Sequence, residues 1–121
     1  MAKPELEFFD PTFDNSRPWV PVPGYPKGIY EKILTIDPPT GPWRMKTRFI
    51  HFQAGIETKE TLCHDYWEEV YLIDGYLIDI AKNQTFKAGM YCCRPPGMKH
   101  GPYKIPFGVT AYEVHYYLDK K

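Results

Sequence analysis

The chain has 121 residues, 43% of them hydrophobic and 17% aromatic, which fits one domain with one core. Fifteen Lys and Arg residues balance fifteen Asp and Glu residues, so we expect no nucleic-acid partner. No apolar run approaches the ~20 residues of a membrane span, and the opening residues lack the apolar stretch of a signal peptide. The three cysteines, with Cys92 and Cys93 adjacent, do not have the pattern of a disulfide framework. We therefore expect a cytoplasmic protein with reduced thiols and no membrane partner.

The first 27 residues are unusually rich in proline and in large apolar side chains. The aromatic residues of this segment are Phe8, Phe9, Phe13, Trp19 and Tyr25. Free linkers are poor in aromatic residues, so residues 1–27 predict an extended arm that packs on its own domain or on a second subunit. Exposing so much apolar surface is unfavourable, and proline suits the edge of a sheet. We therefore expect a homodimer in which the arm covers the partner or the seam between the two.

Residues 28–121 predict an all-β domain. The thirteen prolines and nine glycines of the whole chain interrupt any helical period, whereas the periodic segments alternate by two. The predicted strands are residues 28–36, 43–53, 69–80, 84–91 and 107–118, with a turn at residues 37–42. Strands of this length, separated by turn residues, predict a small sandwich or barrel.

Two groups of residues at fixed spacing carry the chemistry. The first group consists of His64, Glu68 and Gly75, with three and then six residues between them. The second group consists of Gly89, Pro95, Gly97 and His100. Two imidazoles and a carboxylate that converge from separate strands can bind a divalent transition metal and leave positions for water or substrate.

Together these groups resemble the two-part signature of the cupins, which are metal-binding double-stranded jelly rolls. The resemblance implies a double-stranded β-helix (jelly-roll) cupin barrel over residues 28–121, with metal ligands His64, Glu68 and His100. Within the cupins, the chain resembles the small single-domain group that includes the anti-sigma sensor domain and the diketone-cleaving dioxygenases. That narrower resemblance rests on Glu68-Glu69-Val70 before Gly75 and on Phe86-Lys-Ala-Gly-Met-Tyr before the second motif.

The sequence departs from the cupin pattern at three positions. Leu62 stands where the first His is expected, Gly55 lies one residue too far upstream, and Lys104 stands in place of the final Asn. Either the site is a two-His, one-carboxylate triad, a set associated with non-haem Fe(II), or another residue supplies a fourth ligand. The candidates for a fourth ligand are His51, Glu69, Glu113 and His115, and Cys63 is a weaker candidate. Glu113 and His115 share one face of the last strand by the period of two.

The resemblance implies a metal-dependent enzyme that acts on a small oxygenated organic molecule, in the first place an Fe(II) dioxygenase. Zn, Mn and Ni are the other metals that such a site accepts. Tyr103 and Glu113 are the candidates for proton transfer. A decarboxylase, lyase or isomerase that uses the metal without redox chemistry is the alternative enzyme. A domain that only binds, as a sensor of a small molecule or a metal, is the alternative of another class.

Overall fold

The structure is a computed structural model, and it describes residues 3–118. About half of the described residues are in strands, and the only helix among them has three residues, so this part of the chain is all-β as predicted. Its elements are the 3₁₀ helix η1 (Pro11–Phe13) and the strands β1 (Trp19–Pro21), β2 (Ile29–Asp37), β3 (Met45–Phe52), β4 (Ile56–Glu57), β5 (Leu62–Cys63), β6 (Trp67–Asp79), β7 (Gln84–Lys87), β8 (Tyr91–Arg94), β9 (Lys99–His100), β10 (Tyr103–Ile105) and β11 (Val109–Tyr116). Within this part of the chain, no helix is long and apolar enough to cross a membrane.

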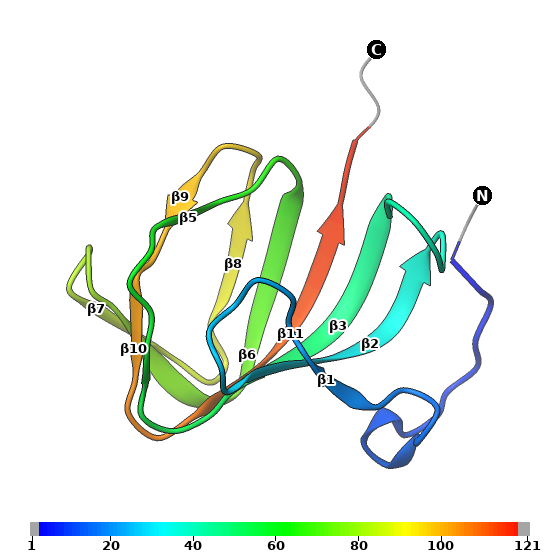
Figure 1. Ribbon diagram of the computed structural model, residues 1–121, viewed down its shortest axis with the longest axis horizontal. Coiled ribbons are helices and arrows are strands. Elements are labelled where there is room, and N and C mark those ends of the chain that lie inside the picture. The colour runs from blue at the N-terminus through cyan, green and yellow to red at the C-terminus, as the bar shows by residue number, and fades with distance from the viewer. Residues whose placement is uncertain (1–2, 119–121) are drawn as a thin grey trace.

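One antiparallel sheet curls round on itself to make the barrel (Figure 1). Its strands follow the order β1-β2-β3-β11-β6-β10-β4, with β7 and β8 also paired to β6, while β5 and β9 form a separate two-stranded ribbon. In Figure 1, β2, β3, β11, β6 and β8 form a curved wall, and β7, β10, β5 and β9 lie on the other side of the hollow. The all-β jelly-roll prediction is therefore confirmed.

Strand β6 belongs to two parts of the curl, and Gly75 lies where they meet. Residues 68–71 of β6 pair with β8, and residues 76–79 pair with β7. Gly75 has a φ of +83°, and a Cβ at this position would lie 2.2 Å from the carbonyl oxygen of Gly108. Only glycine fits here, because a side chain would clash with β11's neighbouring backbone. The last glycine of the first motif thus allows the sheet to curl.

Most predicted strands lie within two residues of the observed ones, but residues 84–91 do not form the single strand that we predicted. They contain β7, a turn at residues 88–89, and the start of β8. Gly89 has a φ of +91°, a left-handed conformation that ends one strand and reverses the chain. The short strands β1, β4, β5, β9 and β10 were not predicted, because two or three residues are too few to show an alternation.

The arm predicted over residues 1–27 consists of two different parts. β1 pairs with β2, and Val22 is buried in the core, so the later part is built into the barrel of its own chain. Before β1, Phe8 is 100% exposed and Phe13 is 80% exposed. Residues 1 and 2 lie outside the described residues. The most exposed apolar side chains of the arm, Phe8 and Phe13, therefore lie before Trp19, while Trp19 and Val20 in β1 are partly exposed.

Charged side chains fill part of the barrel interior, next to an apolar core. The core residues are Val22, Ile29, Ile50, Val70, Leu72, Tyr103, Ile105, Val109 and Ala111. The strand register places Arg48 opposite Glu113, and His115 opposite Glu68, all buried on the inner face. Burying charges is unfavourable unless they are paired or bind an ion, so this end of the barrel is the candidate site.

Candidate metal centre

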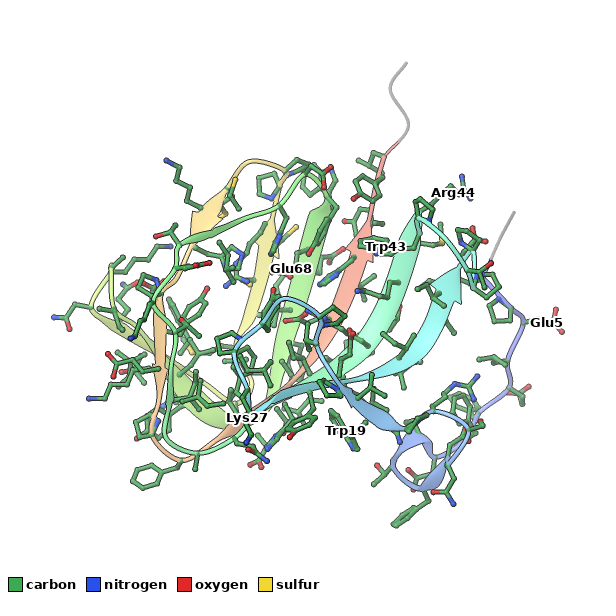
Figure 2. All side chains as sticks on the ribbon, in the orientation of Figure 1. Glu5, Trp19, Lys27, Trp43, Arg44 and Glu68 are labelled. Carbon is green, nitrogen blue, oxygen red and sulfur yellow. The ribbon has the colours of Figure 1, made fainter. Side chains whose placement is uncertain are left out.

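The structure brings His64, Glu68 and His100 together inside the barrel. Glu68 lies on β6, and Figure 2 shows it within the hollow of the curled sheet. His100 ends β9, and His64 follows β5, the partner of β9. Nε2 of His64 lies 3.9 Å from Oε2 of Glu68, and Nε2 of His100 lies 3.9 Å from Oε1 of Glu68. The spacing of the two motifs thus corresponds to one cluster of three possible ligands.

The donor atoms of this cluster fit a divalent ion. Nε2 of His64 and Nε2 of His100 are buried and have no hydrogen-bond partner among the described residues, which is unusual for buried polar atoms. Two ligand atoms that bind one ion at about 2.1 Å lie at most about 4.2 Å apart, so separations of 3.9 Å leave room for the ion.

The two imidazoles are also held in the protonation state that a metal ligand needs. Burial lowers the pKa of His64, and burial together with the nearby Arg94 lowers the pKa of His100 to about 4. Both side chains are therefore neutral at pH 7, and a neutral imidazole offers the lone pair that binds an ion.

A hydrogen-bonded chain surrounds His100 and Glu68. Arg94 donates from Nη1 to Oε1 of Glu68 at 2.7 Å and from Nη2 to the hydroxyl oxygen of Tyr103 at 2.8 Å. Nδ1 of His100 lies 2.8 Å from the same hydroxyl. These contacts fix the orientation of the His100 ring and of the Glu68 carboxylate, as second-layer contacts do around bound metals.

Glu68, Glu113 and His115 form a second cluster on the other side of Glu68. Nε2 of His115 lies 2.9 Å from Oε2 of Glu68 and 3.1 Å from Oε1 of Glu113. Arg48 donates from Nε and Nη2 to Glu113 at 2.9 and 2.8 Å, and from Nη1 to Glu31 at 2.8 Å. Nε2 of His115 already has two carboxylate partners, and only its Nδ1 is buried without a hydrogen-bond partner in the described chain. The nitrogen that faces Glu68 and Glu113 is therefore committed to a charge network rather than to an ion.

The same contacts shift the pKa values in this network. Burial opposes the charged form of Glu113, but Arg48 and His115 outweigh it and lower the pKa of Glu113. Burial also opposes a charge on His115, but the hydrogen bonds to Glu113 and Glu68 raise the pKa of His115. The network therefore favours ionised carboxylates and a protonated imidazole.

The structure does not bring the other candidate ligands to the site. His51 and Glu69 follow Ile50 and Glu68, whose side chains are buried, so by the period of two they point to the outer face of the sheet. Nδ1 of His51 lies 2.8 Å from Oγ1 of Thr110, and Glu69 accepts hydrogen bonds from two tyrosine hydroxyls. Cys63 is exposed. The strands of His51 and Glu69 were predicted from the sequence, but the face that each residue occupies was not.

Sequence reasoning missed Arg48 and Arg94. Both side chains are largely buried and line the cavity. Arg48 lies two residues from Ile50, and Arg94 two residues from Cys92, so each shares the inner face of its strand with that neighbour. A charged residue at an inward position is the signal that could have identified them, because such a residue needs a buried partner.

Aromatic rings cover the histidines on one side. The Tyr66 ring stacks on His64 with a centroid distance of 4.6 Å and an interplanar angle of 13°, and it lies 4.7 Å from His115. The Trp43 ring lies 5.1 Å from the Tyr66 ring and 5.2 Å from the Tyr117 ring, measured between ring centroids. This layer restrains the imidazole rings and shields them from water.

One protein family matches most of the chain. It is described as the ChrR cupin-like domain, and it matches residues 12–117. The chain belongs to the ChrR cupin-like family. A comparison with curated proteins finds no match.

Solved structures agree with this membership. An RmlC-like cupin from Shewanella frigidimarina is 18% identical, with a TM-score of 0.68 over 99% of this chain and 97% of that one. Acetylacetone dioxygenase from Acinetobacter johnsonii is 19% identical, with a TM-score of 0.65 over 97% and 80%. The polyketide cyclase RemF from Streptomyces resistomycificus is 18% identical, with a TM-score of 0.68 over 92% and 79%. At these identities the likeness shows the cupin fold alone, and one fold hosts several chemistries.

Proposed function

We propose that this cupin is a metal-dependent enzyme that acts on a small oxygenated organic molecule, with His64, Glu68 and His100 as the metal ligands. One observation carries the proposal: two buried, neutral imidazole nitrogens have no hydrogen-bond partner within residues 3–118 and lie 3.9 Å from the same carboxylate. A buried polar atom without a partner is unfavourable, and a bound divalent ion removes that cost for both histidines.

Fe(II) is the ion that we favour, with Zn, Mn and Ni as alternatives. Two imidazoles and one carboxylate with open positions are the set that Fe(II) oxygenases use, and one structural relative is named an acetylacetone dioxygenase. Bound at this site, such an ion supplies Lewis-acid and redox chemistry. A dioxygenase is therefore the reaction class that we propose first.

The remaining residues of the site hold the substrate and its protons. Burial raises the pKa of Tyr103, so its hydroxyl keeps its proton at neutral pH and can donate to a substrate oxygen. Glu113 lines the cavity, but it is tied to Arg48 and His115 and is held ionised. We therefore assign Glu113 to positioning, because it holds His115 against Glu68.

Metal analysis followed by oxygen-uptake measurements tests the proposal. We expect about one divalent ion per chain in the purified or reconstituted protein. Glu68→Gln should lose the ion, whereas Glu69→Gln on the outer face should keep it. Substrate-dependent oxygen uptake by the Fe(II) form would support a dioxygenase. Turnover without oxygen uptake would support a decarboxylase, lyase or isomerase instead, and ion binding without any turnover would support a sensor. A protein that binds no divalent ion would contradict the proposal.

We also propose that the protein forms a homodimer in the reducing cytoplasm. The three cysteines are free thiols, which fits that compartment. The exposed Phe8 and Phe13 of the arm need a covering surface, and a second copy would supply it. Removing residues 1–18, which leaves β1 in place, should convert a dimer into a monomer in light scattering. A monomeric full-length protein at high concentration would contradict this.

A further inference from the structure

The cavity inside the barrel has an apolar end and an end that is lined by hydrogen-bond donors. Its volume is about 210 Å³, and a cavity of about 150 Å³ in another protein holds benzene. The apolar end is lined by Ile50, Phe52, Leu77, Phe86 and Ile105. Arg94, His100 and Tyr103 line the other end, beside Glu68. The cavity therefore suits a molecule with a compact apolar body and one polar group.

The hydroxyl of Tyr103 has a proton to offer to that polar group. Arg94 donates to the hydroxyl oxygen at 2.8 Å, and Nδ1 of His100 lies at the same distance. A histidine that binds an ion through Nε2 carries its proton on Nδ1, so both neighbours of the hydroxyl are then donors. Two donors occupy both lone pairs of the oxygen, and the O–H proton is left for another acceptor. Because Tyr103 lines the cavity, a ligand oxygen is the acceptor that this geometry favours.

Arg94 has more hydrogen-bond donors to spare than Arg48. Glu68 and Tyr103 engage two of the five N–H groups of Arg94. Three of the five N–H groups of Arg48 donate to Glu31 or Glu113, and these two carboxylates already balance its charge. Of these two guanidinium groups, Arg94 is therefore the one with more donors for an additional oxygen.

The charge balance of the loaded site favours an anion. The network contains four positive side chains, Arg48, Arg94, Lys46 and the protonated His115, and three negative ones, Glu31, Glu68 and Glu113. Asp79, which is buried and pairs with Tyr103 between β6 and β10, adds one negative charge, whereas Lys82 is exposed. A divalent ion at His64, Glu68 and His100 adds two positive charges to this balance. An uncompensated buried charge is unfavourable, so the loaded cavity favours a negatively charged ligand.

We propose that Arg94 and Tyr103 form a carboxylate-binding site, and that the cavity takes a small monocarboxylic acid with a compact apolar body. The inference deepens the proposed function and rests on it for the ion that sets the proton position on His100. The carboxylate accepts hydrogen bonds from the Arg94 guanidinium and from the Tyr103 hydroxyl, while the apolar body fills the end near Ile105. Arg94 and Tyr103 thereby determine specificity for acids over neutral molecules of the same shape.

Calorimetric titration of the full-length protein tests this site. The probes are benzoate and isobutyrate, compared with the neutral benzamide and isobutyramide, added to the zinc-loaded and to the metal-free protein. We expect the acids to bind the zinc-loaded protein at least about tenfold tighter than the amides. Tyr103→Phe and Arg94→Lys should each weaken acid binding about tenfold and weaken amide binding less, because a hydrogen bond to a charged acceptor is the stronger one. Tyr112→Phe and Arg17→Lys, both outside the cavity, should change acid binding less than about twofold.

Several outcomes would overturn the inference. Acids and amides could bind equally, the two control variants could weaken acid binding as much as the cavity variants, or no acid could bind to either form. Zinc content, measured on the same samples, separates this inference from the proposed function. Zinc binding without acid binding contradicts the carboxylate site alone. Acid binding that depends on Arg94 in a protein that takes up no zinc contradicts the proposed function and supports the carboxylate site.

Discussion

The two sides of Glu68 present histidines in opposite states. On one side, His64 and His100 have buried Nε2 atoms without a hydrogen-bond partner in the described chain, and their pKa values are lowered. On the other side, Nε2 of His115 lies within 3.1 Å of the carboxylates of Glu68 and Glu113, and its pKa is raised. All three side chains are largely buried, so burial alone does not decide their state.

The neighbours of each ring decide whether burial is outweighed. At His100 burial lowers the pKa and the nearby Arg94 adds to this effect, whereas at His115 two carboxylates outweigh burial and favour the charged form. A neutral imidazole binds a metal, and a protonated imidazole cannot. We infer that the His64 side of Glu68 is the ion site and that the His115 side holds the shared carboxylate in place.

The largest expected effect is on metal affinity, when single histidines on the two sides of Glu68 are replaced. His64→Ala or His100→Ala should each abolish stoichiometric metal binding, a loss on the order of a thousandfold in affinity. His115→Asn should weaken binding at most about tenfold to a hundredfold, because it only disturbs the position of Glu68. Competition with a chelator of known affinity measures all three. Full metal content in both alanine variants, or complete loss in the His115 variant, would reverse the assignment.

Breaking the charge network on the His115 side should have the next largest effect, a loss of stability. Arg48→Met leaves Glu113 and Glu31 buried without their guanidinium partner, which should cost about 3–5 kcal/mol of unfolding free energy in urea. Adding Glu113→Gln should recover part of that loss. The matched change Arg17→Met at a more exposed ion pair should cost less than about 1 kcal/mol. An equally large loss of unfolding free energy in Arg17→Met would show that the buried network stabilises the protein no more than a more exposed ion pair does.

The sequence predicts the ion ligands better than it predicts the charge network around His115. His64, Glu68 and His100 stand at motif spacing, so they could be found before the fold was known. The period of two places Glu113 and His115 on one face, but only the register of β11 against β6 puts His115 next to Glu68. Arg48 and Arg94 have no motif position, and their partners are distant in the sequence. The long strands follow from alternation, whereas the ribbon of β5 and β9 depends on tertiary contacts.

The stability of the metal-free protein should have its maximum near pH 6.5. The pKa of His100 is about 4 in the folded protein against 6.5 ordinarily, so the unfolded chain takes up a proton first as the pH falls. Stability should therefore fall between pH 6.5 and about 4, by up to about 3 kcal/mol. The raised pKa of His115 acts in the opposite direction: its stabilising contribution is present below pH 6.5 and is lost as the pH rises through the folded value.

Urea unfolding at a series of pH values measures this profile. His100→Gln should flatten the acid side, and His115→Gln should flatten the alkaline side. Below about pH 4.5, protonation of Glu68 and Glu113, whose pKa values are lowered, should add a further loss. A profile that rises steadily through pH 8 would contradict the opposite states that we assign to His100 and His115.

The smallest effect should come from Leu62, the residue that stands where the cupin pattern has its first histidine. Leu62 pairs directly with His100 across β5 and β9, and it lines the cavity, so its side chain lies on the His100 side of the ribbon. An imidazole introduced by Leu62→His should reach the ion and tighten metal binding about tenfold, roughly 1.4 kcal/mol. It should also slow turnover, because it would occupy a position that a substrate needs. Leu62→Gln, of similar size but a poor ligand, should not tighten binding. An unaltered metal affinity in Leu62→His would place the side chain of residue 62 outside the reach of the ion, although residue 62 pairs with His100.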